Sequence, residues 1–247
     1  MLIPFLSQAI AFPSPNSATP EGIVAVGGDA SPKRLLAAYQ SGIFPWPHDD
    51  LPLLWFSPDP RFVLVPEQAH VGRSLRKRAR RGTYEVRTDT AFAEVMRACS
   101  ASPRPGQNGT WITQELIEGY TELHALGFAH SIESWENGQL VGGLYGVSLG
   151  GMFFGESMFT RAPDASKVAF ATLLGNVIAW GFDLVDCQAY TTHLERFGAV
   201  EWPRRRFLRV LKASLQKPTR IGRWSFDLSP VEAIARLRSD GDCDGGF

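Results

Sequence analysis

Prolines are concentrated at the start of this 247-residue chain, and their distribution limits what the first quarter can form. Ten of the 17 prolines lie before residue 61. Proline fixes φ and lacks a backbone N–H, so helix interiors and central strands exclude it. We therefore expect residues 42–61 to be an ordered loop rather than a helix or a central strand. A solvated linker is the alternative, but it would expose four large aromatic side chains. These are Phe44, Trp46, Trp55 and Phe56.

The spacing of apolar residues becomes regular after residue 61 and predicts a mixed set of elements. The expected strands are 62–65, 83–87, 128–135, 140–149, 152–159, 182–188 and 207–211. The expected helices are 31–40, 71–81, 90–99, 113–127, 166–180, 193–197 and 229–238. Asn137-Gly138 is a strong signal for a two-residue hairpin turn. Helices, then a three-strand meander, then alternating helices and strands indicate an α+β layer fold.

Composition excludes several classes of protein. Hydrophobic residues make up 44% of the chain, which is too many for a disordered protein. No apolar run approaches the roughly 20 residues that a membrane helix needs, and the first residues lack a basic region, so we expect no signal peptide. Cys99, Cys187 and Cys243 are too few and too far apart for a disulfide framework or a zinc site. This usage favours a reducing cytoplasm.

The net charge is zero, but the charges are segregated along the chain. Residues 73–87 hold seven basic side chains against the single acid Glu85, and a second basic cluster covers 204–206 and Arg209. Like charges at i, i+4 destabilise a helix by about 0.2–0.5 kcal/mol per pair. A solvated helix face is the ordinary explanation of such a run. We favour a phosphate-bearing partner for the helix near 73–81, because no acid is interleaved there.

Asp186-Cys187-Gln188 ends an otherwise apolar strand. Alternation along a strand would place Asp186 and Gln188 on one face and Cys187 on the other. A buried carboxylate needs a hydrogen-bond donor, and an amide two residues away could supply one. The alternative is an ordinary polar strand end at the surface. Cys187 is expected to be a small core thiol rather than a nucleophile.

Glu156 follows Phe153 and Phe154 in a strand flanked by glycines. Glycine in a strand often marks a bulge or the close approach of a ligand, so a carboxylate here could hold a cation. The alternative is a solvent-facing glutamate on a two-faced strand. The histidines show no metal-ligand spacing, and no phosphate-loop or dinucleotide motif is present. We therefore expect no metal and no cofactor.

Five motifs in order along the chain resemble the leucyl/phenylalanyl-tRNA–protein transferase family. They cover residues 42–46, 55–61, 141–146, 152–159 and 186–188, with the sequences GIFPW, WFSPDPR, VGGLYG, MFFGESMF and DCQ. The resemblance implies a small N-terminal domain, residues 1–62. It also implies an aminoacyl-transfer domain over 63–247 that is similar to GNAT acetyltransferases, with a mixed, mostly antiparallel sheet.

The resemblance also implies a reaction. Leu or Phe, and less well Met, would move from aminoacyl-tRNA to the α-amine of a protein that begins with Arg or Lys (EC 2.3.2.6). The product would be degraded in the bacterial cytoplasm. We expect a monomer that requires no membrane. Because the tRNA ester is already activated, the reaction should need no ATP and no metal.

The family's functional residues carry over by motif. Asp186 and Gln188 resemble the catalytic pair, and Glu156 resembles the residue that accepts the basic N-terminal side chain. Met158 and Leu144 resemble walls of the pocket for the Leu or Phe side chain, and Trp111 resembles a further substrate-binding residue. The family's tRNA-binding basic helix resembles 73–81, with the contacts assigned to Arg73, Arg76, Lys77, Arg80 and Arg81.

A carboxylate is a much weaker base than an α-amine, so it is a poor acceptor for the proton of the amine. We therefore expect Asp186 to orient the amine, directly or through Gln188, and to accept a proton only in the transition state. Two alternatives remain open. An acyl-CoA-dependent N-acyltransferase would need a phosphate-cradling loop before a helix, and residues 161–164 lack the glycines for one. A non-catalytic tRNA-binding module would leave Asp186, Gln188 and Glu156 without a role.

Overall fold

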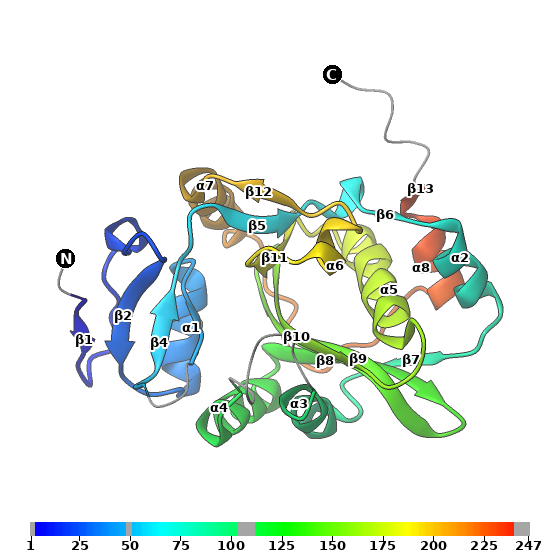
Figure 1. Ribbon diagram of the computed structural model, residues 1–247, viewed down its shortest axis with the longest axis horizontal. Helices are drawn as coiled ribbons and strands as arrows, with labels where there is room; N and C mark the ends of the chain where they lie inside the picture. The colour runs from blue at the N-terminus through cyan, green and yellow to red at the C-terminus, as the bar shows by residue number, and fades with distance from the viewer. Residues whose placement is uncertain (1–2, 48–50, 103–111, 240–247) are drawn as a thin grey trace.

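Two β-sheets of different size organise the structure, a computed structural model that describes residues 3–47, 51–102 and 112–239 (Figure 1). The smaller sheet has the order β1-β2-β4-β3. Its strands are β1 (Phe5–Leu6), β2 (Ile23–Gly27), β3 (Phe44–Pro45) and β4 (Leu54–Phe56). Helix α1 (Pro32–Gln40) and the 3-10 turn η1 (Pro15–Ser17) belong to the same part of the chain.

The larger sheet has seven strands in the order β12-β5-β11-β10-β9-β8-β7. Its strands are β5 (Arg61–Leu64), β7 (Glu85–Thr88), β8 (Ala129–Glu136), β9 (Gln139–Leu149), β10 (Met152–Thr160), β11 (Leu184–Gln188) and β12 (Val200–Trp202). Neighbouring strands are antiparallel except β10 and β11, which run parallel. The predicted α+β class and the mixed, mostly antiparallel sheet are therefore confirmed.

Helices cover both faces of the larger sheet (Figure 1). They are α2 (Arg73–Arg80), α3 (Phe92–Ser100), α4 (Gln114–Ala125), α5 (Ala165–Ala179), α6 (Thr192–Glu195), α7 (Arg204–Ser214) and α8 (Pro230–Ala235). The 3-10 turn η2 (Pro66–Gln68) and a short ribbon of β6 (His70–Val71) with β13 (Arg238–Ser239) complete the fold. No helix in the described ranges is both long and apolar enough to cross a bilayer.

Alternation along β10 sends neighbouring side chains into two different cores. Phe153 joins the cluster around α5, whereas Phe154 joins the cluster that α1, α3 and α4 also enter. This period of two follows from the pleat of a strand. Glu156 lies two residues after Phe154, so its side chain leaves the strand on the same side, toward α1 and α4. That position places its carboxylate beside the N-terminal part of the chain.

The meander and most of the helices lie where the sequence predicted them. Asn137 and Gly138 have positive φ values of 50° and 77°, which suits the tight turn between β8 and β9. Ser229 and Glu232 form the predicted capping box at the start of α8. The helix predicted from residue 71 begins at Arg73.

Two predictions about secondary structure were wrong. Residues 54–56 form β4, which lies between β2 and β3, although we expected no central strand in this region. Pro52 and Pro58 lie outside these three residues, and Pro45 lies on the edge strand β3, where a missing N–H is tolerated. Residues 207–211 lie inside helix α7, not in a strand. Their apolar positions follow a helical spacing, with Phe207 and Leu211 buried four residues apart.

Helix α4 fixes the N-terminal part of the chain to the larger sheet. The backbone N–H of Ala30 donates to Glu115 Oε1 at 2.9 Å, one turn before Gly119. A Cβ atom at Gly119 would overlap the carbonyl oxygen of Ala30, so only glycine allows the helix to approach this closely. One continuous hydrophobic core includes side chains from α1, β4, α4 and β9.

We predict that Gly119→Ala destabilises the protein by about 1–3 kcal/mol, the usual cost of overpacking a core. In an exposed helix the same change would stabilise by up to about 1 kcal/mol. Urea unfolding measures the difference, and Glu122→Ala on the exposed face of α4 is the matched control. A Gly119→Ala protein as stable as the parent would contradict the close contact.

Candidate active site

One cavity of about 690 Å³ brings together five of the residues that the sequence singled out. Leu144, Glu156, Met158, Asp186 and Gln188 all line it, from strands β9, β10 and β11. Phe44 and Trp46 lie on one side, and Tyr190, Thr191, His193 and Leu194, just before and within α6, lie on another. A largely apolar wall with a few convergent polar groups is typical of a small-molecule site.

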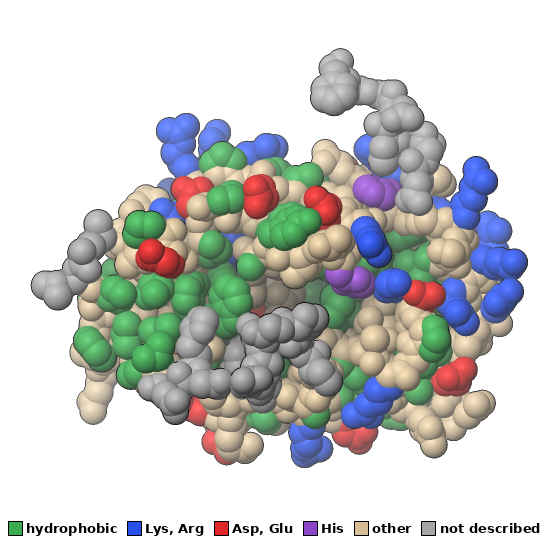
Figure 2. All heavy atoms as spheres, in the orientation of Figure 1, with side chains coloured by type: hydrophobic (Ala, Val, Ile, Leu, Met, Phe, Trp, Pro, Cys, Tyr) green, Lys and Arg blue, Asp and Glu red, His purple; other side chains and the backbone are tan. Residues whose placement is uncertain are grey.

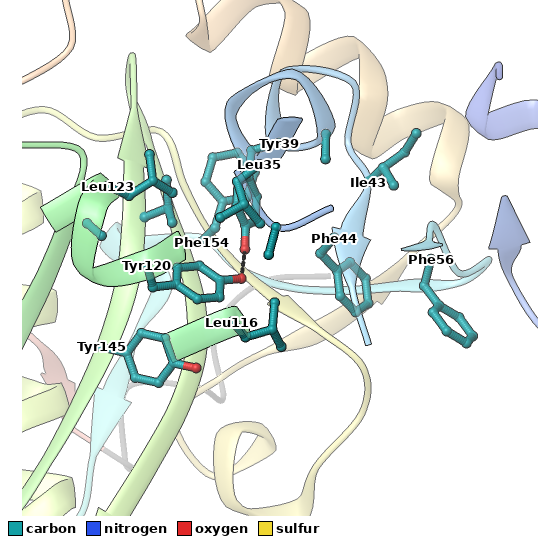
Figure 3. Close-up of a cluster of buried hydrophobic side chains, with 14 of the residues drawn as sticks. Leu35, Tyr39, Ile43, Phe44, Phe56, Leu116, Tyr120, Leu123, Tyr145 and Phe154 are labelled. Carbon is teal, nitrogen blue, oxygen red and sulfur yellow. Dashed lines mark hydrogen bonds between the residues drawn. The ribbon is translucent and has the colours of Figure 1, made fainter. Parts of the chain in front are cut away.

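Glu156 is held by three donors from three different elements. Tyr39 Oη on α1 donates to Oε1 at 2.7 Å, and Tyr120 Oη on α4 donates to Oε2 at 2.8 Å. Gln188 Nε2 on β11 donates to Oε1 at 2.6 Å. The two tyrosine hydroxyls also contact each other, and Figure 3 shows them meeting between the two helices. Glu156 is therefore not the solvent-facing glutamate of the alternative interpretation.

Burial sets the protonation of this cluster. It raises the pKa of Glu156 to about 7, and the nearby charge of Asp186 adds to that effect. The hydrogen bonds from Tyr39, Tyr120 and Gln188 act in the opposite direction, because they stabilise the carboxylate. Burial also raises the pKa of both tyrosines well above their usual value, as does the charge of Glu156. The tyrosines therefore stay neutral donors at physiological pH.

Asp186 forms a bidentate ion pair with Arg61. Arg61 Nε lies 2.8 Å from Oδ1 and Nη2 lies 2.6 Å from Oδ2, and both side chains are 0% exposed. The guanidinium lies between the rings of Phe44 and Phe207, with its carbon 4.6 and 4.5 Å from the two ring centroids. This arrangement supplies a planar cation with hydrogen bonds at its edge and aromatic contacts on both faces.

Gln188 departs from strand geometry. Its φ is +64°, and the pairing of β11 with β5 shifts register between Asp186 and Gln188. The Gln188 backbone N–H donates to Asp186 Oδ1 at 3.0 Å, while its side chain turns to Glu156. The expected donor for Asp186 is thus the backbone amide of Gln188, together with Arg61. The strand is therefore irregular at its last residue.

Cys187 lines the same cavity but is poorly suited to nucleophilic chemistry. Burial raises the pKa of its thiol well above the usual value, and the charge of Asp186 adds to the shift. Across the described ranges, no group of three or more His, Cys, Asp and Glu side chains could hold a metal ion.

Helix α2 lies apart from the cavity and exposes most of its basic side chains. Leu75 and Ala79 are buried, as the spacing predicted. Four of the five proposed tRNA contacts are exposed, namely Arg73, Lys77, Arg80 and Arg81. Arg76 instead donates to the carbonyl oxygens of Ile234 and Leu237 at 2.9 and 2.7 Å, so it holds the C-terminal end of α8. Trp111 lies outside the described residues.

Arg61, Tyr39 and Tyr120 are the site residues that sequence reasoning missed. Tyr120 has the helical spacing of a core residue, and Tyr39 lies on the apolar face of α1. Arg61 offers one signal, since it is a single charge that opens an apolar strand and belongs to the motif 55–61. Nothing in the sequence pairs it with a carboxylate 125 residues away.

Comparisons with family models and with curated proteins all point to one family. The family model described as "Leucyl/phenylalanyl-tRNA protein transferase" matches residues 63–212, and its "N-terminal domain" matches 28–59. A leucyl/phenylalanyl-tRNA--protein transferase of Myxococcus xanthus (strain DK1622) is 62% identical over 214 residues, which cover 87% of this chain and 92% of the relative.

Two further relatives carry the same name. The protein of Anaeromyxobacter sp. (strain Fw109-5) is 56% identical over 227 residues, covering 92% of this chain and 97% of its own length. That of Nitratidesulfovibrio vulgaris (strain DP4) is 56% identical over 217 residues, covering 88% and 93%. Both the domain matches and these relatives extend across the cavity residues described above. The chain therefore belongs to the leucyl/phenylalanyl-tRNA protein transferase family.

Proposed function

We propose that the cavity on β9, β10 and β11 is where this chain carries out its family's reaction. The chain is a leucyl/phenylalanyl-tRNA–protein transferase (EC 2.3.2.6) of the N-end rule pathway, with aminoacyl-tRNA as donor and a protein as acceptor. We further propose that the acceptors begin with Arg or Lys and that the enzyme acts as a monomer in the bacterial cytoplasm. Residues 63–247 would form a GNAT-like transfer domain. The observation that carries it is the meeting of Glu156, Asp186 and Gln188 in one apolar cavity.

The apolar wall suits the side chain of the transferred amino acid. Leu144 and Met158 lie in the cavity beside Val185 and Phe170. A hydrophobic pocket separates side chains that differ by one methylene by only about 1–3 kcal/mol. Leu and Phe would therefore be preferred, and Met would also be transferred, less efficiently.

Glu156 suits the cationic side chain of the acceptor. It is a carboxylate in a partly buried setting, where a charge-assisted hydrogen bond to a guanidinium or an ammonium is stronger than in water. Tyr39, Tyr120 and Gln188 fix its position from three sides. A neutral or acidic first residue would leave this carboxylate without a cationic partner, so the site would discriminate against such acceptors.

In the reaction the α-amine attacks the ester carbonyl, an amide bond forms, and the ester bond to the tRNA 3′ end breaks. The amine loses one proton, and the departing ribose oxygen gains one. Gln188 Nε2 is used by Glu156, and no other described residue hydrogen-bonds to Gln188 Oε1, so this oxygen can accept from the amine. Both Asp186 oxygens are engaged by Arg61 and the Gln188 amide, so Asp186 acts by holding Gln188 rather than by accepting the proton.

The acyl-CoA alternative is disfavoured at the helix where its phosphates would bind. Asp164 is the N-cap of α5, and its carboxylate pairs with Lys167 at 2.7 Å and lies 3.8 Å from Arg78. A carboxylate beside the start of a helix repels a phosphate that approaches the same backbone N–H groups.

A transfer assay tests the proposal directly. The protein is incubated with labelled Phe-tRNA and a peptide that begins with Arg, without coenzyme A. The labelled Phe-Arg peptide should appear, and a matched peptide that begins with Ala should give little product. Binding of Phe-tRNA without product would identify a non-catalytic module. Product only with an acyl-CoA donor would identify the other alternative.

Glu156→Gln is predicted to raise KM for Arg-starting peptides by roughly tenfold or more, because a neutral amide pairs weakly with a cation. The affinity for Phe-tRNA should not change. Steady-state kinetics with the peptide and filter binding of the tRNA measure the two effects, with Glu122→Gln on the surface of α4 as control. Equal losses for Arg-starting and Ala-starting peptides would rule out the assigned role.

The binding of a cationic acceptor is predicted to strengthen as pH rises through 7. Glu156 has a pKa of about 7, so its ionised fraction increases about tenfold between pH 6 and pH 8. A competition assay with a non-reacting Arg-peptide measures this binding separately from the titration of the α-amine. The change should disappear in Glu156→Gln. A flat profile in the parent protein would contradict the assignment.

Asp186→Asn is predicted to lower kcat by at least a hundredfold and to change the Kd of Phe-tRNA by less than about threefold. Removing one partner of a buried ion pair also costs about 3–5 kcal/mol of stability, so the folded fraction is measured alongside by circular dichroism. A folded Asp186→Asn protein with impaired tRNA binding and normal kcat would refute the role of Asp186 in positioning Gln188 for the transfer step.

A further inference from the structure

The outer face of α7 carries basic side chains that do not line the cavity and that form no ion pair with another described residue. Arg205, Arg209 and Lys212 recur at i, i+4 and i+7, so they form one stripe, and Arg206 lies beside it. All four are exposed. The opposite face is apolar, with Phe207 and Leu211 buried. We call these four residues the α7 basic face.

Nothing in the described part of the chain neutralises these charges. None of the ion pairs within those ranges includes a residue of α7. Arg206 lies over the ring of Trp202, 3.7 Å from its centroid, and this contact leaves its charge uncompensated. Arg204, the remaining arginine of the cluster, is used internally, since its Nη1 donates to the carbonyl oxygen of Ser57.

The position of these charges in the helix is unfavourable for the protein alone. Three arginines occupy the first turn, which contains no acid, although the helix dipole favours acids there and disfavours cations. Arg205 and Arg209 add a repulsive i, i+4 pair. A structural role would not need this arrangement, whereas an external polyanion would relieve it.

The buried side of α7 adjoins the strands that carry the cavity residues. Helix α7 begins two residues after β12, which pairs with β5, which in turn pairs with the catalytic strand β11. Strands β12 and β11 are two strand spacings apart, about 10 Å. Phe207, on the buried face of α7, packs against the Arg61 guanidinium that holds Asp186. Figure 2 shows basic side chains gathered at two places, over α7 at the upper left and over α2 at the right.

We infer that the α7 basic face binds the sugar-phosphate backbone of the aminoacyl-tRNA donor, in addition to the contacts proposed for α2. This inference rests on the proposed function. The tRNA is the substrate whose charge is always strongly negative and whose reacting end must enter the cavity, whereas acceptor proteins differ in charge. A stripe from Arg205 to Lys212 spans about 10 Å along the helix axis and can follow a short run of phosphates.

The test compares two double variants that each remove two charges. Arg205→Gln/Arg209→Gln changes the α7 basic face, and Lys33→Gln/Arg97→Gln changes exposed cations on α1 and α3. We expect the α7 variant to bind Phe-tRNA about tenfold more weakly at 50 mM salt, with a slope of log Kd against log salt that is shallower by one to two. The control should match the parent. Arg205→Lys/Arg209→Lys should retain most of the affinity, because a point charge still pairs with phosphate.

A short donor separates this inference from the proposed function. With 3′-phenylalanyl-adenosine, which has no phosphate backbone, the α7 variant should transfer Phe to an Arg-peptide as fast as the parent. If the parent transfers from neither donor, the proposed function fails. If the parent transfers from both donors, and the α7 variant matches the control in its Kd for Phe-tRNA at 50 mM salt and in its salt slope, the α7 inference alone fails. A loss that appears only in KM for acidic acceptor proteins would also overturn it and assign the face to the acceptor.

Discussion

The buried ion pair between Arg61 and Asp186 is the interaction on which the site depends. Removing two charges from water costs roughly several kcal/mol of desolvation free energy per ion, unless their mutual geometry and further hydrogen bonds offset it. Here two short bonds join the pair, the Gln188 amide gives Asp186 a third donor, and two aromatic rings cover the guanidinium. The pair thereby connects strand β5, strand β11 and helix α7. Asp186 also accepts a hydrogen bond from the backbone N–H of Gln188. Gln188 has a left-handed backbone conformation, and its side chain donates to Glu156.

The two carboxylates of the cavity have different surroundings and so different roles. Asp186 faces a permanent cation that the protein itself supplies, so it is neutralised before any substrate arrives. Glu156 faces only neutral donors, and burial raises its pKa to about 7. It is therefore the carboxylate that gains most from an incoming cation. This division supports our proposal that a basic N-terminal residue binds at Glu156 while Asp186 positions Gln188.

Sequence reasoning worked where local rules decide the structure. The meander followed from Asn137-Gly138 and from alternating apolar residues, and α8 followed from its capping box. It failed where tertiary contacts override local preference, as in β4, a three-residue strand between prolines that is stabilised by pairing on both sides. In the site, Glu156, Asp186 and Gln188 could be chosen because each stands out within its own strand. Arg61 and Tyr39 could not be, because their partners lie 125 and 117 residues away along the chain.

A double-mutant cycle on the ion pair tests this account most directly. The transfer rate kcat is measured for the parent, Arg61→Gln, Asp186→Asn and the double variant, each checked for folding. If Asp186 can hold Gln188 only while Arg61 fixes its carboxylate, adding Asp186→Asn to Arg61→Gln should lower kcat by no more than about threefold, although Asp186→Asn alone is severe. A second loss in the double variant as large as in the parent would show that Asp186 acts on the substrate independently of Arg61, and would contradict the account.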